Sequence, residues 1–379
     1  MTPALRVALV VHHRLELGTG AAGSTLALAA GLRHRGHQVD VIGLDLIDNR
    51  DGLRAQLAFP SAVARFVRRA LRDDAYDVID ASTGDISRLT RRDVRHHRTA
   101  FVTRSHGLEP LGVAARRAGE ERGELDLRRR YGVYHGGWRL NEVRRSLEIA
   151  DAVAVLNVDE RRYVEELGVD PRRIFITAPI ASRAFAPAPD ATSELKILVV
   201  GGTQWRKGCA DAELATYEFL ELFPHARATI LGRSPAFLDA HAPTHIRGQL
   251  TGLESFDPSD ASVLYASHSV FVHLSRFEGF GLMVSEAMSH GLCVVSTDIA
   301  GPRDQLVPGS GELVPVGDID AAVAALTRVA DNETRQAMST RAFEASRRFE
   351  PDRVVDALVE NYRQTVASKA SANGTKEAP

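Results

Sequence analysis

One segment, residues 270–291, joins the pattern of a buried strand to that of a helix through a loop with two glycines. The apolar run 270–274 has the length and composition of a strand, and the apolar spacing over 282–290 predicts a helix that Gly291 terminates. A chain that turns this way presents the helix's unpaired N–H groups and the positive end of its dipole above the loop. We therefore expect an anion site at this turn, and a phosphate is the usual anion.

Two carboxylates flank the turn, Glu278 in the loop and Glu286 in the helix. Glu286 lies more than one turn inside the helix, so the two do not share a helical face, and a shared metal ion is disfavoured. A carboxylate repels phosphate but accepts hydrogen bonds from sugar hydroxyls, each contributing about 1.5–3 kcal/mol. A phosphate between two hydroxyl-bearing rings describes a nucleoside diphosphate sugar. The alternative is an ordinary capped helix with surface glutamates, which the Gly-Phe-Gly loop and the following strand disfavour.

This segment resembles the C-terminal signature of the large retaining glycosyltransferase family 4, the group 1 transferases, whose two Rossmann-like domains form the GT-B architecture. The matching residues are Glu278, Gly279, Phe280, Gly281, Glu286, Ala287, Met288, Gly291, Val294 and Val295. The resemblance implies that Glu278 contacts the donor sugar and that Glu286 binds the ribose. It implies diphosphate binding by the backbone amides of Gly279, Phe280, Gly281 and Leu282. Cys293 stands where the family has a proline.

The composition is that of a soluble globular protein, with 379 residues, 44% hydrophobic and 25% charged. No apolar run approaches the roughly 20 residues that span a bilayer. The two cysteines are far apart in the sequence, which excludes a disulfide framework. We expect a cytoplasmic location, with peripheral contact at the inner face of the membrane as an alternative.

The charge is unevenly distributed along the chain. Residues 1–185 hold 30 arginines and 24 acidic residues, whereas the remainder holds 17 basic and 25 acidic residues. A basic N-terminal half suits an anionic or lipid-linked acceptor or an acidic membrane surface. An arginine-rich, solvated surface explains the same counts.

Strand and helix patterns alternate twice along the chain, which predicts two doubly wound α/β domains facing a cleft. We expect an acceptor-binding domain over residues 1–185 and a nucleotide-sugar domain over 186–350, separated by a proline- and alanine-rich linker. In the first, the pattern after Pro60 predicts a helix over 61–72. The resemblance implies that a final helix, 351–367, crosses back to the N-terminal domain. The polar tail 368–379 is expected to be disordered. Ligands in such sheets bind at the carboxyl ends of the strands.

Two adjacent cations, Arg206 and Lys207, follow the strand at 195–200 and precede a helix. Cations at a helix N-terminus oppose its dipole by roughly 0.3–1 kcal/mol, so an anion should compensate them. In the resembled family this loop reads G-R-x4-K-G. Lys207 and Gly208 match it, but Gly202 occupies the arginine position. We assign both cations to the diphosphate.

A glycine-rich run with Gly18, Gly20 and Gly23 follows the first strand and opens a helix. A dinucleotide site is one explanation of such a run. The resemblance implies instead a loop that closely approaches acceptor or donor phosphate.

His106 stands at the end of the strand at 99–103, before a glycine. The resemblance suggests that it helps to hold the donor sugar, whereas His12, His13, His96, His97 and His135 are interpreted as surface or local contacts.

No metal-site spacing is evident, so Lys207, Arg206 and the helix dipole would replace a divalent cation, and no cofactor is expected. We predict a retaining transferase that moves a hexose-type sugar from a nucleoside diphosphate to an acceptor hydroxyl. Catalysis would rest on Glu278, Lys207 and His106, and no nucleic-acid partner is expected. A non-catalytic sugar-nucleotide-binding partner of another transferase and a GT-B-type epimerase remain alternatives. The donor base, the sugar, the acceptor and the oligomeric state stay open.

Overall fold

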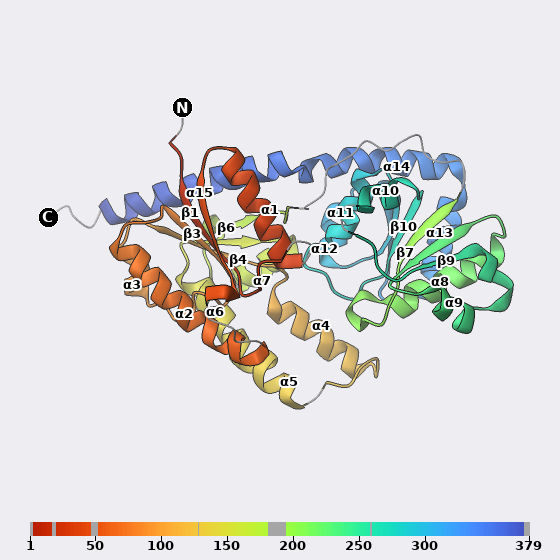
Figure 1. The fold of residues 1–379 in the computed structure, drawn as a ribbon, viewed down its shortest axis with the longest axis horizontal. Helices are drawn as coiled ribbons and strands as arrows, with labels where there is room; N and C mark the ends of the chain where they lie inside the picture. The colour runs from red at the N-terminus through yellow and green to blue at the C-terminus, as the bar shows by residue number, and fades with distance from the viewer. Residues whose placement is uncertain are drawn as a thin grey trace. The chain divides into compact units, whose positions relative to one another are not determined.

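The computed structural model describes residues 3–16, 20–46, 52–127, 129–180, 195–257 and 260–374 (Figure 1). The chain divides into two compact units. The first comprises Met1–Arg117, Asp126–Ser182 and Pro351–Pro379, and the second comprises Ala118–Leu125 and Arg183–Glu350. Each unit contains a parallel six-stranded sheet with flanking helices, which confirms the predicted fold class of two doubly wound α/β domains.

The sheet of the first unit has the strand order β2-β1-β3-β4-β5-β6. The strands are β1 (Arg6–Val10), β2 (Gln38–Ile42), β3 (Val78–Ser82), β4 (Ala100–Arg104), β5 (Ala152–Val155) and β6 (Ile174–Ile176). The order reverses between β1 and β3, and ligands of open parallel sheets bind beyond the carboxyl ends of the strands at such a switch point.

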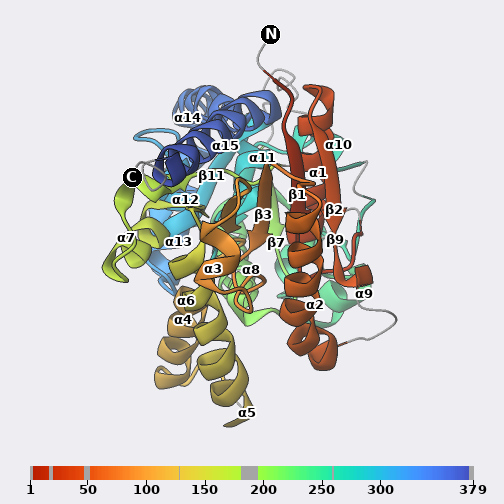
Figure 2. The same ribbon diagram turned by 90° about the vertical axis from the view of Figure 1, so that its left-hand side faces the viewer.

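Alternating side chains of this sheet enter two different cores. Val7 and Leu9 pack on the face covered by α1 (Gly20–His34) and α15 (Pro351–Gly374), which lie side by side (Figure 2). Ala8 and Val10 pack on the opposite face against α2 (Gly52–Arg72). The remaining helices include α3 (Arg91–Arg95), α4 (Glu109–Glu121), α5 (Arg129–Val133), α6 (Arg139–Ile149) and α7 (Val158–Glu166).

Helix boundaries correct two of the predictions. Helix α2 spans Gly52–Arg72 with Pro60 inside it, whereas the sequence pattern predicted a start at residue 61. Helix α15 continues past residue 367 to Gly374, so residues 368–374 are helical rather than disordered. Lys369 explains the extension, because its buried ammonium pairs with Asp151 at 2.5 Å. Residues 375–379 and the predicted boundary at 185–186 lie outside the described residues.

The sheet of the second unit has the order β12-β11-β10-β7-β8-β9, with its switch point between β7 and β10. Its strands are β7 (Lys196–Val200), β8 (Arg227–Leu231), β9 (Leu250–Leu253), β10 (Val270–His273), β11 (Cys293–Thr297) and β12 (Gly311–Val314). The edge strands β9 and β12 were not assigned from the sequence.

The second sheet is also covered on both faces. Its helices are α8 (Cys209–Leu222), α9 (Pro235–His241), α10 (Ala261–Ala266), α11 (Leu282–Ser289), α12 (Ala300–Gln305), α13 (Ile319–Ala330) and α14 (Asn332–Ser346). Ile197 and Val199 pack with α8 and α13, whereas Leu198 and Val200 pack with α10 and α11. In the part of the chain that the structure describes, no helix combines the length and the apolar character needed to cross a membrane.

Candidate functional site

Two loops meet at the switch point of the second unit, one after β7 and one after β10. The backbone N–H of Arg276 donates to the carbonyl of Arg206 at 2.8 Å. Gly208 makes this approach feasible: its φ is +58°, and a Cβ there would lie 1.8 Å from the carbonyl oxygen of Leu274. The loops predicted to carry Arg206, Lys207 and Glu278 are therefore in direct backbone contact.

Glu278 joins the two cations. Its Oε2 accepts from Nη1 of Arg206 at 2.8 Å, and its Oε1 accepts from Nζ of Lys207 at 2.5 Å. The glutamate is only 7% exposed, so the carboxylate is held largely out of water. The cation pair and the glutamate, which the sequence singled out in two separate motifs, thus form one charged cluster at the carboxyl ends of β7 and β10.

His273 and Ser275 complete the surroundings of Glu278. The hydroxyl of Ser275 lies 2.9 Å from Nε2 of His273 and 3.3 Å from Oε1 of Glu278. Burial alone would raise the pKa of Glu278, but the His273 imidazole and the charges of Lys207 and Arg206 outweigh it. The pKa of Glu278 therefore lies well below its usual range, and burial lowers the pKa of His273. The carboxylate is ionised at neutral pH and can only accept hydrogen bonds.

Helix α11 begins immediately after this cluster. Its N-cap is Gly281, with a φ of +87°, no side chain caps the helix, and its first turn contains no acidic residue. The positive end of the dipole is thus not compensated by a side chain of the first turn. Nε2 of Gln305 donates to the carbonyl of Gly281 at 3.4 Å and also to that of Phe280. These two hydrogen bonds hold the loop that precedes α11.

Glu286 lies in the second turn of α11, 7% exposed. The Tyr265 hydroxyl donates to its Oε2 at 3.0 Å, and the Tyr265 ring stacks on His290. The carboxylate of Glu286 is therefore oriented by the buried Tyr265 hydroxyl. Arg206 and Lys207 bind the other carboxylate of the predicted pair, that of Glu278.

Gly202, which stands at the arginine position of the resembled pattern, lies beside a different cation. Oε1 of Glu213 accepts from the Gly202 backbone at 3.1 Å and from Nε of Arg233 at 2.7 Å. Arg233 follows β8, so tertiary structure brings it to this loop, and the sequence analysis did not select it.

In the first unit, His106 follows β4 and its Nε2 lies 3.1 Å from the hydroxyl of Ser82. Burial, with a contribution from the charge of Arg104, lowers the pKa of His106 well below its usual value, so the imidazole is neutral at pH 7. Glu160 holds the loop after His106, accepting from the N–H of Leu108 at 2.7 Å.

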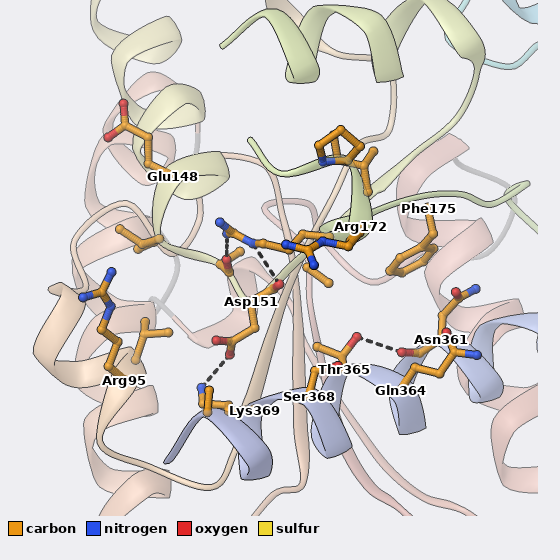
Figure 3. Close-up of a pocket in the computed structure, with 18 of the residues that line it drawn as sticks. Arg95, Glu148, Asp151, Arg172, Phe175, Asn361, Gln364, Thr365, Ser368 and Lys369 are labelled. Atoms are coloured by element: carbon orange, nitrogen blue, oxygen red, sulfur yellow. Dashed lines mark hydrogen bonds and ion pairs between the residues drawn. The ribbon is translucent and has the colours of Figure 1, made fainter. Parts of the chain in front are cut away.

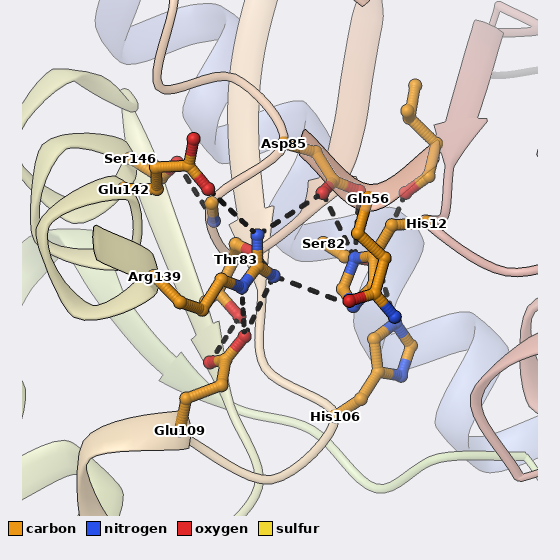
Figure 4. Close-up of polar contacts among 12 residues, drawn as sticks. His12, Gln56, Ser82, Thr83, Asp85, His106, Glu109, Arg139, Glu142 and Ser146 are labelled. Carbon is orange, nitrogen blue, oxygen red and sulfur yellow. Dashed lines mark hydrogen bonds and ion pairs between the residues drawn. The ribbon is translucent and has the colours of Figure 1, made fainter. Parts of the chain in front are cut away.

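The structure corrects the interpretation of His12 as a local contact (Figure 4). Its Nδ1 lies 3.0 Å from the fully buried Asp85 carboxylate. Its Nε2 lies 3.5 Å from Arg139, which donates to Glu109 at 2.8 Å. His12 follows β1 and Asp85 follows β3, the two strands at the switch point of this sheet, whereas Glu109 begins α4 and Arg139 begins α6. The signal that the sequence analysis missed was position: His12 comes directly after the first strand.

The predicted glycine loop at the N-terminus is also corrected. Gly20 and Gly23 belong to the first turn of α1, so they are helical rather than part of a loop, and Gly23 is buried. Gly18 lies outside the described residues. The described residues contain no group of three or more His, Cys, Asp or Glu side chains that could hold a metal ion.

A family model described as glycosyl transferases group 1 matches residues 183–345. Residues 183–345 belong to the group 1 glycosyltransferases. This match covers the second unit's cluster and α11, and it confirms the resemblance that the E-x7-E segment suggested.

Relatives extend over almost the whole chain. A phosphatidyl-myo-inositol mannosyltransferase of Mycolicibacterium smegmatis is 25% identical, covering 96% of this chain and 94% of its own. A D-inositol 3-phosphate glycosyltransferase of Kineococcus radiotolerans is 26% identical, covering 97% of each chain. The structure of a sucrose-phosphate synthase from Thermosynechococcus elongatus superposes with a TM-score of 0.72 at 19% identity, covering 96% of this chain and all of that one. This last likeness shows a shared fold.

Proposed function

We propose that this group 1 glycosyltransferase moves a hexose-type sugar from a nucleoside diphosphate to an acceptor hydroxyl, with retention of configuration and without a metal ion. The observation that carries the proposal is the Glu278 carboxylate held between Arg206 and Lys207, immediately before the uncapped N-terminus of α11.

The charge of this cluster favours a diphosphate. Two cations face one carboxylate, which leaves one net positive charge beside the positive end of α11. The negative charge of a donor diphosphate would be compensated by side chains and backbone amides that already lie at this site. Preorganised cations of this kind also stabilise charge that develops on a leaving group. We assign Arg206, Lys207 and the amides of residues 279–282 to the diphosphate.

The reaction breaks the bond between the anomeric carbon and the diphosphate oxygen, and the acceptor oxygen bonds to the same face of that carbon. The acceptor proton passes to the departing phosphate oxygen. Glu278 is assigned to the sugar hydroxyls, because an ionised carboxylate accepts hydrogen bonds, and Glu286 to the ribose. We assign the neutral His106 to the donor sugar and the His12–Asp85–Arg139 network to the acceptor.

Inositol appears in the names of two relatives, so inositol compounds are the first acceptors to test. We propose a cyclitol or another polyol, either free or linked to a lipid. The excess of basic residues in the N-terminal half supports peripheral contact with an anionic membrane for a lipid-linked acceptor. Transfer to phosphatidylinositol in vesicles, compared with free myo-inositol, separates these two forms.

The decisive experiment begins with a thermal-shift screen of UDP-, GDP-, ADP- and dTDP-sugars in EDTA. The donor found is then used in transfer assays, and NMR of the product gives the anomeric configuration. Glu286→Ala should raise the donor KM, and Lys207→Ala should lower kcat. Glu254→Ala, an exposed carboxylate of the same unit, is the matched control. Wild-type kinetics in both site variants would refute the assignment.

One observation supports the alternative of a non-catalytic sugar-nucleotide-binding partner. Arg233, the cation that lies beside Gly202, is already paired with Glu213 and stacked on Phe237. That alternative predicts donor binding with neither transfer nor donor hydrolysis. An epimerase would convert the donor in the absence of any acceptor, so the same assays distinguish all three.

A further inference from the structure

A cavity lies in the first unit, at the edge of the sheet opposite its switch point. Its volume is about 610 Å³, and it is lined by α3, by the residues that precede and begin β5 and β6, and by the last turns of α15 (Figure 3). These are the amino-terminal ends of the strands, whereas His12 and His106 follow their carboxyl ends. The cavity therefore belongs to the opposite edge of the sheet, and its volume is in the range of small-molecule sites.

Cationic side chains dominate the lining. Five cations face two carboxylates, and the cations are Arg91, Arg95, Arg172, Arg173 and Lys369. The carboxylates are Glu148 and Asp151. A concave surface with such an excess of positive charge attracts anions.

The least exposed cations of the lining already interact with other groups of the protein. Lys369 pairs with Asp151 at 2.5 Å, and Nε of Arg173 donates to the Asp151 carbonyl at 3.1 Å. Burial lowers the pKa of Arg173, the charges of Asp151 and Asp170 raise it, and the charge of Arg95 lowers it. Arg95 and Arg173 both line the cavity, and an anion bound there would offset their like charges.

Arg91 and Arg95 are the cations left for a ligand. Both are exposed on α3, four residues apart and therefore on one helical face, and neither forms an ion pair with another described residue. Guanidinium groups bind phosphate oxygens through two parallel hydrogen bonds. Arg172, by contrast, is held by Asp170 at 2.7 Å.

The facing wall, on α15, is polar, and its one charged residue, Lys369, is already paired with Asp151. Asn361, Gln364, Thr365 and Ser368 recur at the spacing of a single face of α15, and all line the cavity (Figure 3). Amides and hydroxyls both donate and accept hydrogen bonds, as the hydroxyl groups of a ligand also do. The half-buried ring of Phe175 supplies an apolar wall beside them.

We propose that this cavity binds a phosphate ester whose carbon skeleton carries hydroxyl groups, with Arg91 and Arg95 on the phosphate and the polar face of α15 on the hydroxyls. The site is separate from the donor cluster of the second unit and does not depend on the proposed transfer reaction. It gives the chain a place to bind a sugar phosphate or polyol phosphate in addition to its donor.

Isothermal titration of the full chain with glucose 6-phosphate and with inorganic phosphate tests the proposal. The double variant Arg91→Ser/Arg95→Ser should weaken glucose 6-phosphate binding at least tenfold. The control, Arg72→Ser/Arg92→Ser, removes the same charge from exposed arginines that do not line the cavity and should bind as wild type. Absence of saturable binding, or equal loss in both variants, would overturn the site.

The hydroxyl contacts have their own readout. Thr365→Val/Ser368→Ala should lower the preference for glucose 6-phosphate over inorganic phosphate, and an unchanged preference would overturn that part of the proposal. Lys207→Ala should bind glucose 6-phosphate normally, so a failure at the donor cluster is distinguishable from a failure here. Circular dichroism confirms that each variant is folded.

Vesicles that contain phosphatidylinositol identify the source of the ligand. Co-sedimentation that requires Arg91 and Arg95, and that glucose 6-phosphate displaces, identifies a lipid headgroup. Binding of glucose 6-phosphate without co-sedimentation identifies a soluble ester. Both outcomes support the site, and failure of both probes overturns it.

Discussion

Replacing Glu278 by glutamine keeps the shape of the side chain and removes the negative charge that lies between Arg206 and Lys207. The variant loses two charge-assisted contacts of 2.8 and 2.5 Å. Each such contact contributes about 1.5–3 kcal/mol, but the side chains of Arg206 and Lys207 are 34% and 22% exposed, so water recovers part of this. We expect the free energy of unfolding to fall by about 2 kcal/mol.

The same change should strengthen binding of the free nucleoside diphosphate. In the wild type the carboxylate repels the diphosphate, by about 2 kcal/mol for unit charges about 8 Å apart at an effective dielectric constant of about 20. Screening reduces this, so we expect a several-fold lower Kd in the variant and a larger stabilisation by the nucleotide. Sugar transfer should fall, because the acceptor of the sugar hydroxyls has lost its charge.

Differential scanning calorimetry with and without the nucleotide, together with transfer kinetics, checks these expectations. A depressed pKa means that the stability from Glu278 is present above the ordinary glutamate pKa and is lost only as the pH falls through the folded value. The stability difference between wild type and variant should therefore be constant from pH 6 to 8. Equal stabilisation of both proteins by the nucleotide, with unchanged transfer, would refute the reasoning.

Three further predictions concern the frame around the sites. Tyr362→Phe removes a fully buried hydroxyl that donates to Asp80, and should lower the free energy of unfolding by about 1.5–3 kcal/mol in urea titrations; a loss below about 0.5 kcal/mol would contradict this. Burial raises the pKa of Glu160 to about 7, so its stabilisation is full below the ordinary glutamate pKa and is lost as the pH rises through 7. Glu160→Gln should abolish that pH dependence, and identical stability–pH curves would count against it. Gly208→Ala should abolish donor binding in a folded protein, because its Cβ would collide with the Leu274 carbonyl, and normal donor affinity would disprove the close contact.

Local pattern was sufficient for the regular elements and for the E-x7-E segment. The strand at 270–274 and the helix after Gly281 have unambiguous periodicity, and a glycine in the left-handed region is required where one turns into the other. Local pattern failed where context decided the outcome. The helix predicted near residues 61–72 begins at Gly52 and continues through Pro60, and the short edge strands β9 and β12 carry little periodic signal.

For the charged clusters too, the sequence predicted some features and only the tertiary structure decided others. The sequence alone predicted the two-domain α/β class, the resemblance to the group 1 glycosyltransferases and the candidate residues Glu278, Lys207 and Arg206, because each prediction rests on local pattern in the chain. Only the tertiary structure decided that Glu278 lies between the two cations, and that His12 joins Asp85 and Arg139. Those contacts link residues more than 70 positions apart, and parallel strands bring them together by aligning their carboxyl ends.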